Sequence, residues 1–434
     1  MIYKQISQKI SSFHGKACPE KGILVGYGAL LERFELKIPL PANLSLISTK
    51  NRKYRTPQWQ VFTPRHEPED TLYGHLIFAL KYEGINLLFF KKLFETIPVK
   101  EVTSLVVLVP LGQYSRKIWF LYEWLTLSKL SIPDLDKANY IPIVNDAIQY
   151  CLSNGQKVQR QRILNNLPGN INFCPLVYKT KKIETYIRED LQLQSSTLLK
   201  RTHKDILLRT SAFLLLKDSK ASFSIEGETP TTTRAISWSQ AISQAGKKEL
   251  NKEEIERLQH ILIENSKFIK YGYRKQQGFI GDHDRDTMVP LPDHIPANWE
   301  DLDTLMNGLF NTLKLLEVDH FHPILTAAII SFGFVIIHPL EDGNGRMHRY
   351  LIHHILSKSR FSSQGIIFPI SAFILNHIDE YRKVLEAYSH PVITQIQWEA
   401  TPDHNIRLLQ DTLDYYRYYD ATLQVEFLFD SVLD

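Results

Sequence analysis

The pattern of apolar and polar positions changes character near residue 190 of the chain. Before that point it is mixed. The apolar, β-branched run Ser104–Leu111 predicts a buried strand. In Glu69–Ile97 the apolar residues recur at intervals of three and four, which predicts two helices separated at Gly84. Residues 1–190 are therefore expected to form a mixed α/β domain, whose role the pattern does not reveal.

After about residue 195 the apolar spacing is typical of helices that pack on one another. Phe279–Pro292 differs, because two short apolar pieces flank a charged turn, which predicts an exposed hairpin. The longest apolar run, Ile324–Ile337, suits a buried helix and is too short for a membrane span of about 20 residues. We expect a mainly α fold, with an all-helical bundle and a short β-hairpin over residues 195–420 and a helical extension over 421–434. The predicted helices are Lys204–Lys217, Asn251–Lys267, Trp299–Leu316, Pro323–Ile337, Arg346–Ser357, Ala372–Tyr388, Asn405–Tyr419 and Thr422–Leu433.

Composition excludes several classes of protein. With 44% hydrophobic and 23% charged residues among 434, the chain can bury a core, and wholesale disorder is excluded. Its three cysteines form no CxxC pair, which argues against a disulfide scaffold and a cysteine-built zinc site. The net charge of +4 argues against a dedicated nucleic-acid binder without excluding nucleic acid as a partner. The first residues contain lysines and no apolar stretch, so we expect a cytoplasmic protein without a membrane partner.

The segment His338–Arg349, HPLEDGNGRMHR, contains the residues best suited to chemistry. Pro339 cannot extend the preceding helix and is expected to hold His338 in an extended conformation. A buried helix thus ends at a histidine, the side chain best suited to proton transfer near neutral pH. His338 is the candidate base.

The residues that follow His338 are suited to binding phosphate. The glycines of Gly343–Gly345 permit positive φ angles, so that backbone N–H groups can converge on an anion beside the next helix N-terminus. Arg346 and Arg349 share one face of that helix and add two guanidinium groups. Asp342 is placed to hold a divalent cation. Either a GNG turn or a histidine at a helix end is usually only structural, and it is their combination that predicts a pyrophosphate site beside a base.

This segment resembles the signature of Fic-domain proteins, HxFx(D/E)GNGRxxR. The family phenylalanine is Leu340 here, which keeps an apolar anchor of smaller volume. The positions that match are His338, Asp342, Gly343, Asn344, Gly345, Arg346 and Arg349.

The resemblance implies a nucleotidyltransferase, usually a protein adenylyltransferase. His338 would accept the proton of a Ser, Thr or Tyr hydroxyl of a target protein, or of the chain itself, as that hydroxyl attacks the α-phosphate of ATP. Asp342 would hold Mg²⁺ or Mn²⁺, and Gly343–Gly345, with Asn344, would fix the α-phosphate. Arg346 would then bind the β-phosphate, and Arg349 the γ-phosphate.

A second segment resembles the inhibitory motif (S/T)xxxE(G/N) of the same family. It runs from Ser222 to Gly227 and contains Glu226. The resemblance implies that Glu226 pairs with Arg349 and that Ser222 helps to hold the inhibitory helix. The alternative is a surface acid near a helix end. Whether the chain also removes AMP is left open.

Two further regions are weaker candidates. The edge formed by Thr287, Met288 and Val289 in the predicted hairpin would align a target segment by strand addition, unless the hairpin is merely solvated. The adenine pocket would be formed by Tyr381, Leu385 and Glu386, for which core packing is an equal alternative.

Three histidines on the helix after the motif raise the question of a metal site. His348, His353 and His354 lack the spacing of an HExxH motif, so they are expected to be exposed or partly buried helix residues.

Two alternatives to an adenylyltransferase stay open. One is a Fic-fold transferase of another phosphate-containing group, phosphoryl or UMP. The other is a catalytically quiet, nucleotide-sensing module that binds DNA or protein. Self-association is also left open.

Overall fold

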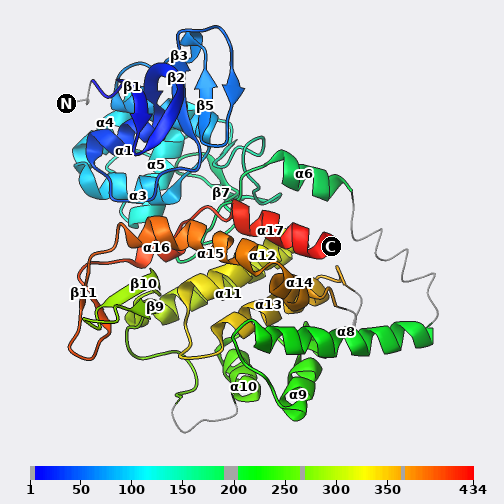
Figure 1. The fold of residues 1–434 in the computed structure, drawn as a ribbon. Coiled ribbons are helices and arrows are strands. Elements are labelled where there is room, and N and C mark those ends of the chain that lie inside the picture. Colours follow the sequence, from blue (N-terminus) through cyan, green and yellow to red (C-terminus); the bar gives the residue numbers. More distant parts are fainter. Residues whose placement is uncertain (1–4, 190–203, 264–268, 363–366) are drawn as a thin grey trace. The chain divides into compact units, whose positions relative to one another are not determined.

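The computed structural model describes residues 5–189, 204–263, 269–362 and 367–434, and its contacts divide the chain into two compact units (Figure 1). The units are Met1–Leu167 and Pro168–Asp434. The boundary thus lies before the position near 190 that the sequence suggests. The reason is that Leu176 pairs with Asp420 and the N–H of Tyr178 donates to Thr422 Oγ1, which ties this stretch to the C-terminal unit.

The N-terminal unit is built on a five-stranded sheet of order β1-β2-β3-β5-β4. Strands β3 and β5 are parallel and the other neighbours antiparallel, with Leu46 opposite Val61 in the buried centre. A smaller sheet has the order β6-β8-β7. The strands are β1 (Gln8–Phe13), β2 (Lys16–Val25), β3 (Leu44–Ser48), β4 (Tyr54–Arg55), β5 (Trp59–Phe62), β6 (Ile141–Pro142), β7 (Gln156–Val158) and β8 (Ile163–Asn165).

Helices complete this unit, and one of them corrects the sequence prediction. The run Ser104–Leu111 is not a strand, because Val99–Leu108 forms helix α4. Its buried residues, Val102, Leu105 and Val106, recur at helical spacing. A continuous apolar run is compatible with both a helix and a strand, so the sequence alone does not distinguish them. The predicted break at Gly84 is confirmed, since this glycine has a φ of +83°. The helices are α1 (Gly26–Phe34), η1 (Pro64–His66), α2 (Leu72–Phe78), η2 (Ala79–Glu83), α3 (Leu87–Thr96), α4 and α5 (Gln113–Thr126).

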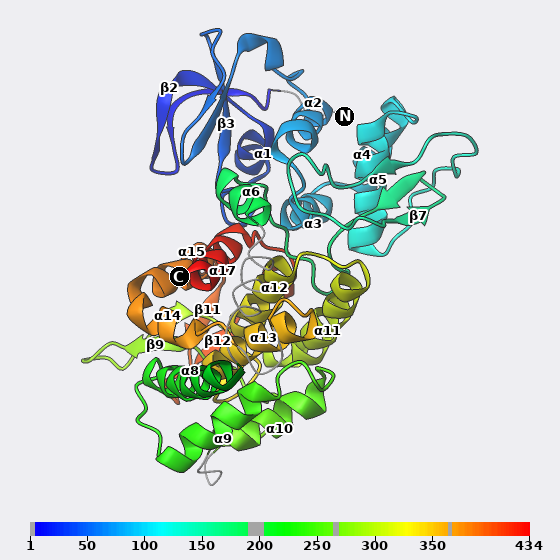
Figure 2. The ribbon, with the colours of Figure 1, turned by 90° about the vertical axis from the view of Figure 1, so that its right-hand side faces the viewer.

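The C-terminal unit is mainly helical and surrounds α12 (Pro323–Ile337), as predicted. All but one of the residues Ile324–Ile337 are buried. Figures 1 and 2 show α11 and α13 beside α12, and α8 on the far side of α13. The helices are α6 (Lys181–Arg188), α8 (Lys204–Ser224), α9 (Thr232–Ser243), α10 (Lys252–Leu262), η3 (Trp299–Asp301), α11 (Leu302–Val318), α12, α13 (Asn344–Lys358), α14 (Ile370–Asn376), α15 (Ile378–Ile393), α16 (Leu413–Arg417) and α17 (Thr422–Leu433).

Two of the predicted helices in this unit are interrupted. Ala372–Tyr388 spans the end of α14 and most of α15, which are separated at His377. Asn405–Tyr419 is not one helix, because β12 (Ile406–Leu408) pairs with β11 (Trp398–Ala400) before α16 begins.

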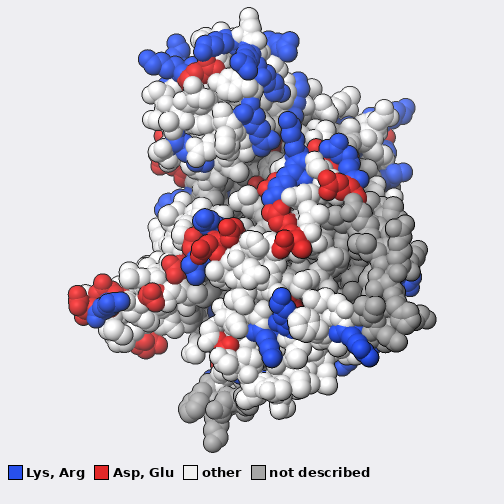
Figure 3. Space-filling model, turned by 45° about the vertical axis from the view of Figure 1, so that its right-hand side comes forward, with Lys and Arg blue, Asp and Glu red and all other residues white. Residues whose placement is uncertain are grey.

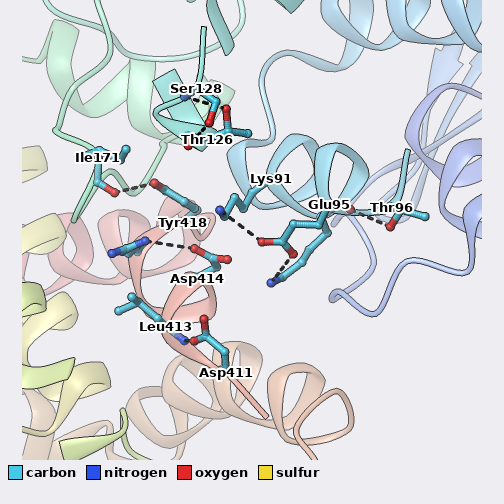
Figure 4. Close-up of polar contacts among 12 residues, drawn as sticks. Lys91, Glu95, Thr96, Thr126, Ser128, Ile171, Asp411, Leu413, Asp414 and Tyr418 are labelled. Atoms are coloured by element: carbon cyan, nitrogen blue, oxygen red, sulfur yellow. Dashed lines mark hydrogen bonds and ion pairs between the residues drawn. The ribbon is translucent and has the colours of Figure 1, made fainter. Parts of the chain in front are cut away.

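Side chains near both ends of α16 form hydrogen bonds with the backbone. Figure 4 shows Asp411 accepting a hydrogen bond from the N–H of Leu413 at the start of α16, at 2.9 Å. It also shows Tyr418 donating to the carbonyl of Ile171, at 2.5 Å, within the same unit.

Among the residues that the structure describes, no helix is both long and apolar enough to cross a membrane.

Candidate active site

His338 ends α12 in a left-handed conformation, with φ 54° and ψ 60°. The sequence predicted an extended conformation, which is wrong. The N–H of His338 still donates to the carbonyl of Phe334 at 2.9 Å, so the residue closes the helix in the left-handed geometry common at helix C-termini. The turn directs the chain from a buried helix into the glycine loop.

The imidazole of His338 is prepared to act as a base. Nδ1 lies 3.3 Å from the carbonyl oxygen of Val335, and since a carbonyl can only accept, we assign the proton to Nδ1. Nε2 then carries the free lone pair. Burial, followed by the neighbouring His294 and Arg274, lowers the pKa of His338 to about 3, so the ring is neutral at physiological pH.

Arg274 holds this turn in place. It is buried, and its Nε donates to the carbonyl of His338 at 2.9 Å, while its backbone N–H donates to Pro339. A further guanidinium bond reaches the carbonyl of Ala297. Behind α12, His294 Nε2 bonds the carbonyl of Ile336 at 2.9 Å. Sequence reasoning missed Arg274 and His294, because neither lies in a recognisable motif.

The loop after His338 is braced from within. Asn344 is buried, and its amide both accepts from the N–H of Leu340 and donates to its carbonyl, at 3.0 and 2.8 Å. Its side chain therefore shapes the loop, although a phosphate contact had been expected. Leu340 is buried, which confirms its role as an apolar anchor. Gly343 caps α13 with a φ of +93°, whereas Gly345 lies inside the first helical turn without a positive φ.

Asp342 presents a partly exposed carboxylate at the mouth of this loop. Its side chain is 43% exposed, and Oδ1 accepts from the N–H of Gly343 and from Arg346 Nη2 at 2.6 and 3.1 Å. Mg²⁺ commonly takes one or two protein carboxylates and completes its shell with water and substrate phosphates. A single accessible carboxylate beside an anion site fits such an ion.

Arg346 and Arg349 lie three residues apart on α13 with almost no exposure. Within the described ranges, Nε and Nη1 of Arg346 and Nη1 of Arg349 are buried without a hydrogen-bond partner. Buried guanidinium N–H groups rarely stay unpaired, so these three donors indicate a binding site for an anion.

The end of α8 faces these arginines. The helix stops at Ser224, and Gly227 follows with a φ of +73°. The N–H of Gly227 donates to Ser224 and that of Glu228 to Phe223, which is the hydrogen-bond pattern of a Schellman motif. We call residues Ser222–Glu228 the α8 turn.

Glu226 of the α8 turn lies against Arg349 and Gly345. Its Oε1 lies 2.8 Å from Nη2 of Arg349. Arg349 also donates from Nε to the hydroxyl of Ser222, at 3.1 Å, and from Nη2 to the carbonyl of Ser222, at 2.7 Å. A Cβ built on Gly345 would lie only 2.2 Å from the same carboxylate oxygen. The carboxylate thus sits against the first turn of α13, where a helix N-terminus favours negative charge.

Glu228 forms an ion pair with the other arginine, without the hydrogen bond that Glu226 accepts from Arg349. Its Oε1 lies 2.8 Å from Nη1 of Arg346, and its Oε2 lies 3.1 Å from Nη1 of Arg234 on α9. The α8 turn therefore places two carboxylates on the two arginines of α13. The sequence motif ends at Gly227 and gives no signal for Glu228.

Helix α8 itself is fixed to the unit by Asp218. This side chain is fully buried and accepts hydrogen bonds from Ser371 N, Ser371 Oγ and Ala372 N, which cap α14. It also contacts His353 Nε2 on α13 at 3.1 Å. Because Asp218 anchors α8, a movement that uncovers the two arginines displaces the α8 turn more easily than the whole helix.

The three histidines of α13 differ from the prediction. His348, His353 and His354 are all buried, because α13 packs between α12 and α8 instead of lying at the surface. Burial lowers the pKa of His348 to about 3 and that of His354 to about 4. No group of three potential metal ligands occurs among the described residues.

The hairpin is formed by β9 (Ile280–His283) and β10 (Pro290–His294), close to the predicted range. Thr287, Met288 and Val289 do not form a strand edge, because they lie in the turn between the strands. There Asp284 accepts from the backbone N–H and the hydroxyl of Thr287, which closes the turn locally.

The three adenine-pocket candidates lie on α15. Tyr381 is buried among Phe332, His348 and Phe427, with ring centroids 5.7 to 6.4 Å apart, so its ring packs in the core. Leu385 and Glu386 are half-buried. Their contact with a base stays a prediction.

Part of the chain that contains this site is similar in sequence to known proteins. The Fic/DOC family matches residues 249–356. A protein adenylyltransferase Fic from Nematostella vectensis is 40% identical over 77 residues, which cover 18% of this chain and 18% of the relative. The protein of the same name from Aedes aegypti is 30% identical over 146 residues, 28% of this chain and 29% of the relative. The matches thus span less than a third of these relatives.

Solved structures give weaker similarities. A Fic family protein from Desulfovibrio desulfuricans has 18% identity and a TM-score of 0.39, over 58% of this chain and 72% of that one. A Fic domain containing signaling protein from Bacteroides thetaiotaomicron has 17% identity and a TM-score of 0.40, over 58% and 94%.

The matched residues 249–356 contain the whole segment His338–Arg349 with its base, glycine loop and arginine pair, while Glu226 and Glu228 lie before them. The chain therefore contains a domain of the Fic/DOC family.

Proposed function

We propose that the chain is an autoinhibited protein adenylyltransferase, which transfers AMP from ATP to a hydroxyl of a target protein or of itself. The relatives named protein adenylyltransferase Fic support this activity. The observation that carries the proposal is the carboxylate of Glu226 against Gly345 and Arg349, because it marks an anion site at the N-terminus of α13, one short loop from His338.

The proposed reaction uses His338 as the base. Nε2 takes the proton of the attacking hydroxyl, whose oxygen forms a bond to the α-phosphorus while the bond to the bridging oxygen breaks and pyrophosphate leaves. Arg346 and Arg349 would hold the β- and γ-phosphates. Mg²⁺ or Mn²⁺ at Asp342 would supply charge neutralisation on the phosphates when bound.

In the proposed inhibited state, the α8 turn competes with the triphosphate. Glu226 engages Arg349 and Glu228 engages Arg346, so each carboxylate stands where a phosphate oxygen would pair. Activation then requires the turn to move away from α13. A Cβ built on Gly227 would meet no atom within 4 Å, so this side of the turn faces open space.

The hairpin is the proposed docking site for the target. Its exposed side chains include Ile280, Met288, Val289 and Leu291, each at least 40% exposed. These apolar side chains, rather than the edge of a strand, would contact the target segment.

Labelled ATP separates this proposal from its alternatives. Wild type, Glu226→Gly, His338→Ala and the double variant are incubated with α- or γ-labelled ATP or with α-labelled UTP, and the transferred label is counted on protein. We expect α-label to appear strongly only with Glu226→Gly and to be lost in the double variant. Label from the γ-position alone would identify a phosphoryltransferase, α-label from UTP but not ATP a uridylyltransferase, and none from any nucleotide a binding module.

Glu228 is expected to add to the effect of Glu226. In a His338→Ala background, which prevents turnover, Glu228→Gln should raise ATP affinity about threefold alone and about tenfold when added to Glu226→Gly. The reason is that a charge-assisted contact with Arg346 is then lost. Calorimetry with Mg·ATP measures both values. Glu253→Gln, on the exposed start of α10, is the matched control, and no gain beyond it would show that Glu228 does not compete with nucleotide.

Arg274 is expected to position the base. Arg274→Lys keeps the charge but cannot bind the His338 and Ala297 carbonyls together, so kcat should fall at least about tenfold, with KM for ATP changed less than about twofold. Both are measured in the Glu226→Gly background, with thermal unfolding to verify folding. An unchanged kcat would show that the clamp is only structural.

A further inference from the structure

The two units of the chain carry charges of opposite sign. Residues 1–167 contain 22 lysines and arginines against 13 acids, which gives +9. Residues 168–434 contain 29 against 34, which gives −5. The net charge of +4 therefore hides a basic N-terminal unit, and charge asymmetry between parts of a chain favours a polyanionic partner for the basic part.

Basic side chains gather at one place on this unit, around the ring of Tyr82. Lys53 Nζ lies 5.6 Å and Lys81 Nζ 4.9 Å from the centre of that ring. The ring of His66 lies 5.6 Å from it. Arg65 directly precedes His66 in the chain. Burial, together with the positive charges of Arg65, Lys53 and Lys81, lowers the pKa of His66. We call these residues the Tyr82 patch.

The scaffold beneath the Tyr82 patch is rigid. Tyr82 packs on a buried cluster formed by Val25, Ile47, Phe62 and Phe78, which joins strands β2, β3 and β5 to α2. Above this core, Lys53, Arg65 and Lys81 are exposed, while His66 and Tyr82 are half-buried. The ring of Tyr82 is thus anchored on the core, and both half-buried rings have exposed cations around them.

The surroundings of the patch are basic rather than apolar. The segment 49–66 contains Lys50, Arg52, Lys53, Arg55 and Arg65 and no acidic residue, although Lys50 pairs with Glu20. Figure 3 shows lysine and arginine atoms gathered at the top of the view, on the N-terminal unit. Among the described residues, no large hydrophobic side chain before Val99 counts as exposed, so membrane insertion is not favoured at this surface.

We propose that the Tyr82 patch binds single-stranded nucleic acid. Lys53, Arg65 and Lys81 pair with backbone phosphates, and unstacked bases stack on the half-buried rings of Tyr82 and His66. Interleaved cations and aromatic rings distinguish this surface from a merely basic one, because only unpaired bases can use the rings. The proposal stands apart from adenylyl transfer, since it uses no residue of the C-terminal unit.

The test measures fluorescence anisotropy of labelled 20-nucleotide oligonucleotides with the full chain. Three phosphate contacts predict that single-strand affinity falls about 20-fold between 50 and 200 mM salt. The triple variant Lys53→Ala, Arg65→Ala, Lys81→Ala should lose at least tenfold in affinity and most of this salt dependence. Tyr82→Leu, which keeps the apolar packing, should lose about fivefold.

A matched triple variant controls for charge. Lys100→Ala, Lys129→Ala, Lys137→Ala removes three exposed cations from the same unit but outside the patch, and should leave affinity within about twofold. Loss equal to that of the patch variant would overturn the proposal, as would equal affinity for a duplex. Binding of the wild type to anionic phospholipid vesicles or to a polyglutamate peptide, with no oligonucleotide binding at 50 mM salt, would also overturn it.

Discussion

Glu226→Gly is expected to raise the rate of AMP transfer at least about 100-fold over wild type. The carboxylate now lies between Gly345 and Arg349 and fills the site that the γ-phosphate would need. A factor of 100 corresponds to about 2.7 kcal/mol, within the range for loss of a hydrogen bond between charged groups. The rate is measured as α-label incorporated into protein at saturating Mg·ATP.

Two variants show what this activation depends on. Glu226→Gln removes the charge but keeps the volume, so it should activate less than Glu226→Gly. Glu249→Gly removes a surface carboxylate that pairs with Lys314 and should leave the rate at the wild-type level. If Glu226→Gly is no faster than Glu249→Gly, the carboxylate does not restrain the reaction.

His338→Ala in the Glu226→Gly background is expected to lower kcat by about 1,000-fold. General-base catalysis usually contributes between about 100- and 10,000-fold, and the structure gives this histidine a free Nε2 through the bond from Nδ1 to Val335. ATP affinity should change little, since no phosphate contact is assigned to this ring. A fall in kcat of less than about tenfold would mean that another group takes the proton.

The pH dependence gives a second measure of the same group. A base works only when deprotonated, and burial lowers the pKa of His338 from 6.5 to about 3. The rate should therefore show no inflection near 6.5 and stay level as the pH falls from 8 to about 5. A decline centred near 6.5 that disappears in His338→Ala would contradict the environment described for this ring.

The parts of the fold that the sequence predicts are those with a single strong pattern. Pro323–Ile337 is buried on every side and bounded by prolines, so its ends are predictable. The Glu226–Arg349 contact is implied by the resemblance of two segments, more than 100 residues apart, to motifs of one family. The helix is thus predictable from its local residue types, whereas the contact is predictable only through that resemblance.

Other features depend on tertiary contacts that no local pattern encodes. Val99–Leu108 is a helix because its buried face packs at helical spacing, whereas the same apolar run suits a strand equally well. Glu228 and Arg274 act through partners distant in sequence, and Arg274 bonds the carbonyl of the left-handed His338 from outside its helix. The +9 and −5 charges emerge only when the structure divides the chain at Leu167.

The most direct measurement is a crystal structure of Glu226→Gly with Mg²⁺ and an ATP analogue that is not cleaved at the α-phosphate. We predict the γ-phosphate within about 3.5 Å of Arg349 and the β-phosphate within the same distance of Arg346. The α-phosphate should lie over the Gly343–Gly345 loop, facing Nε2 of His338. A triphosphate bound away from α13, or an α-phosphate on the far side of the loop from His338, would contradict the account.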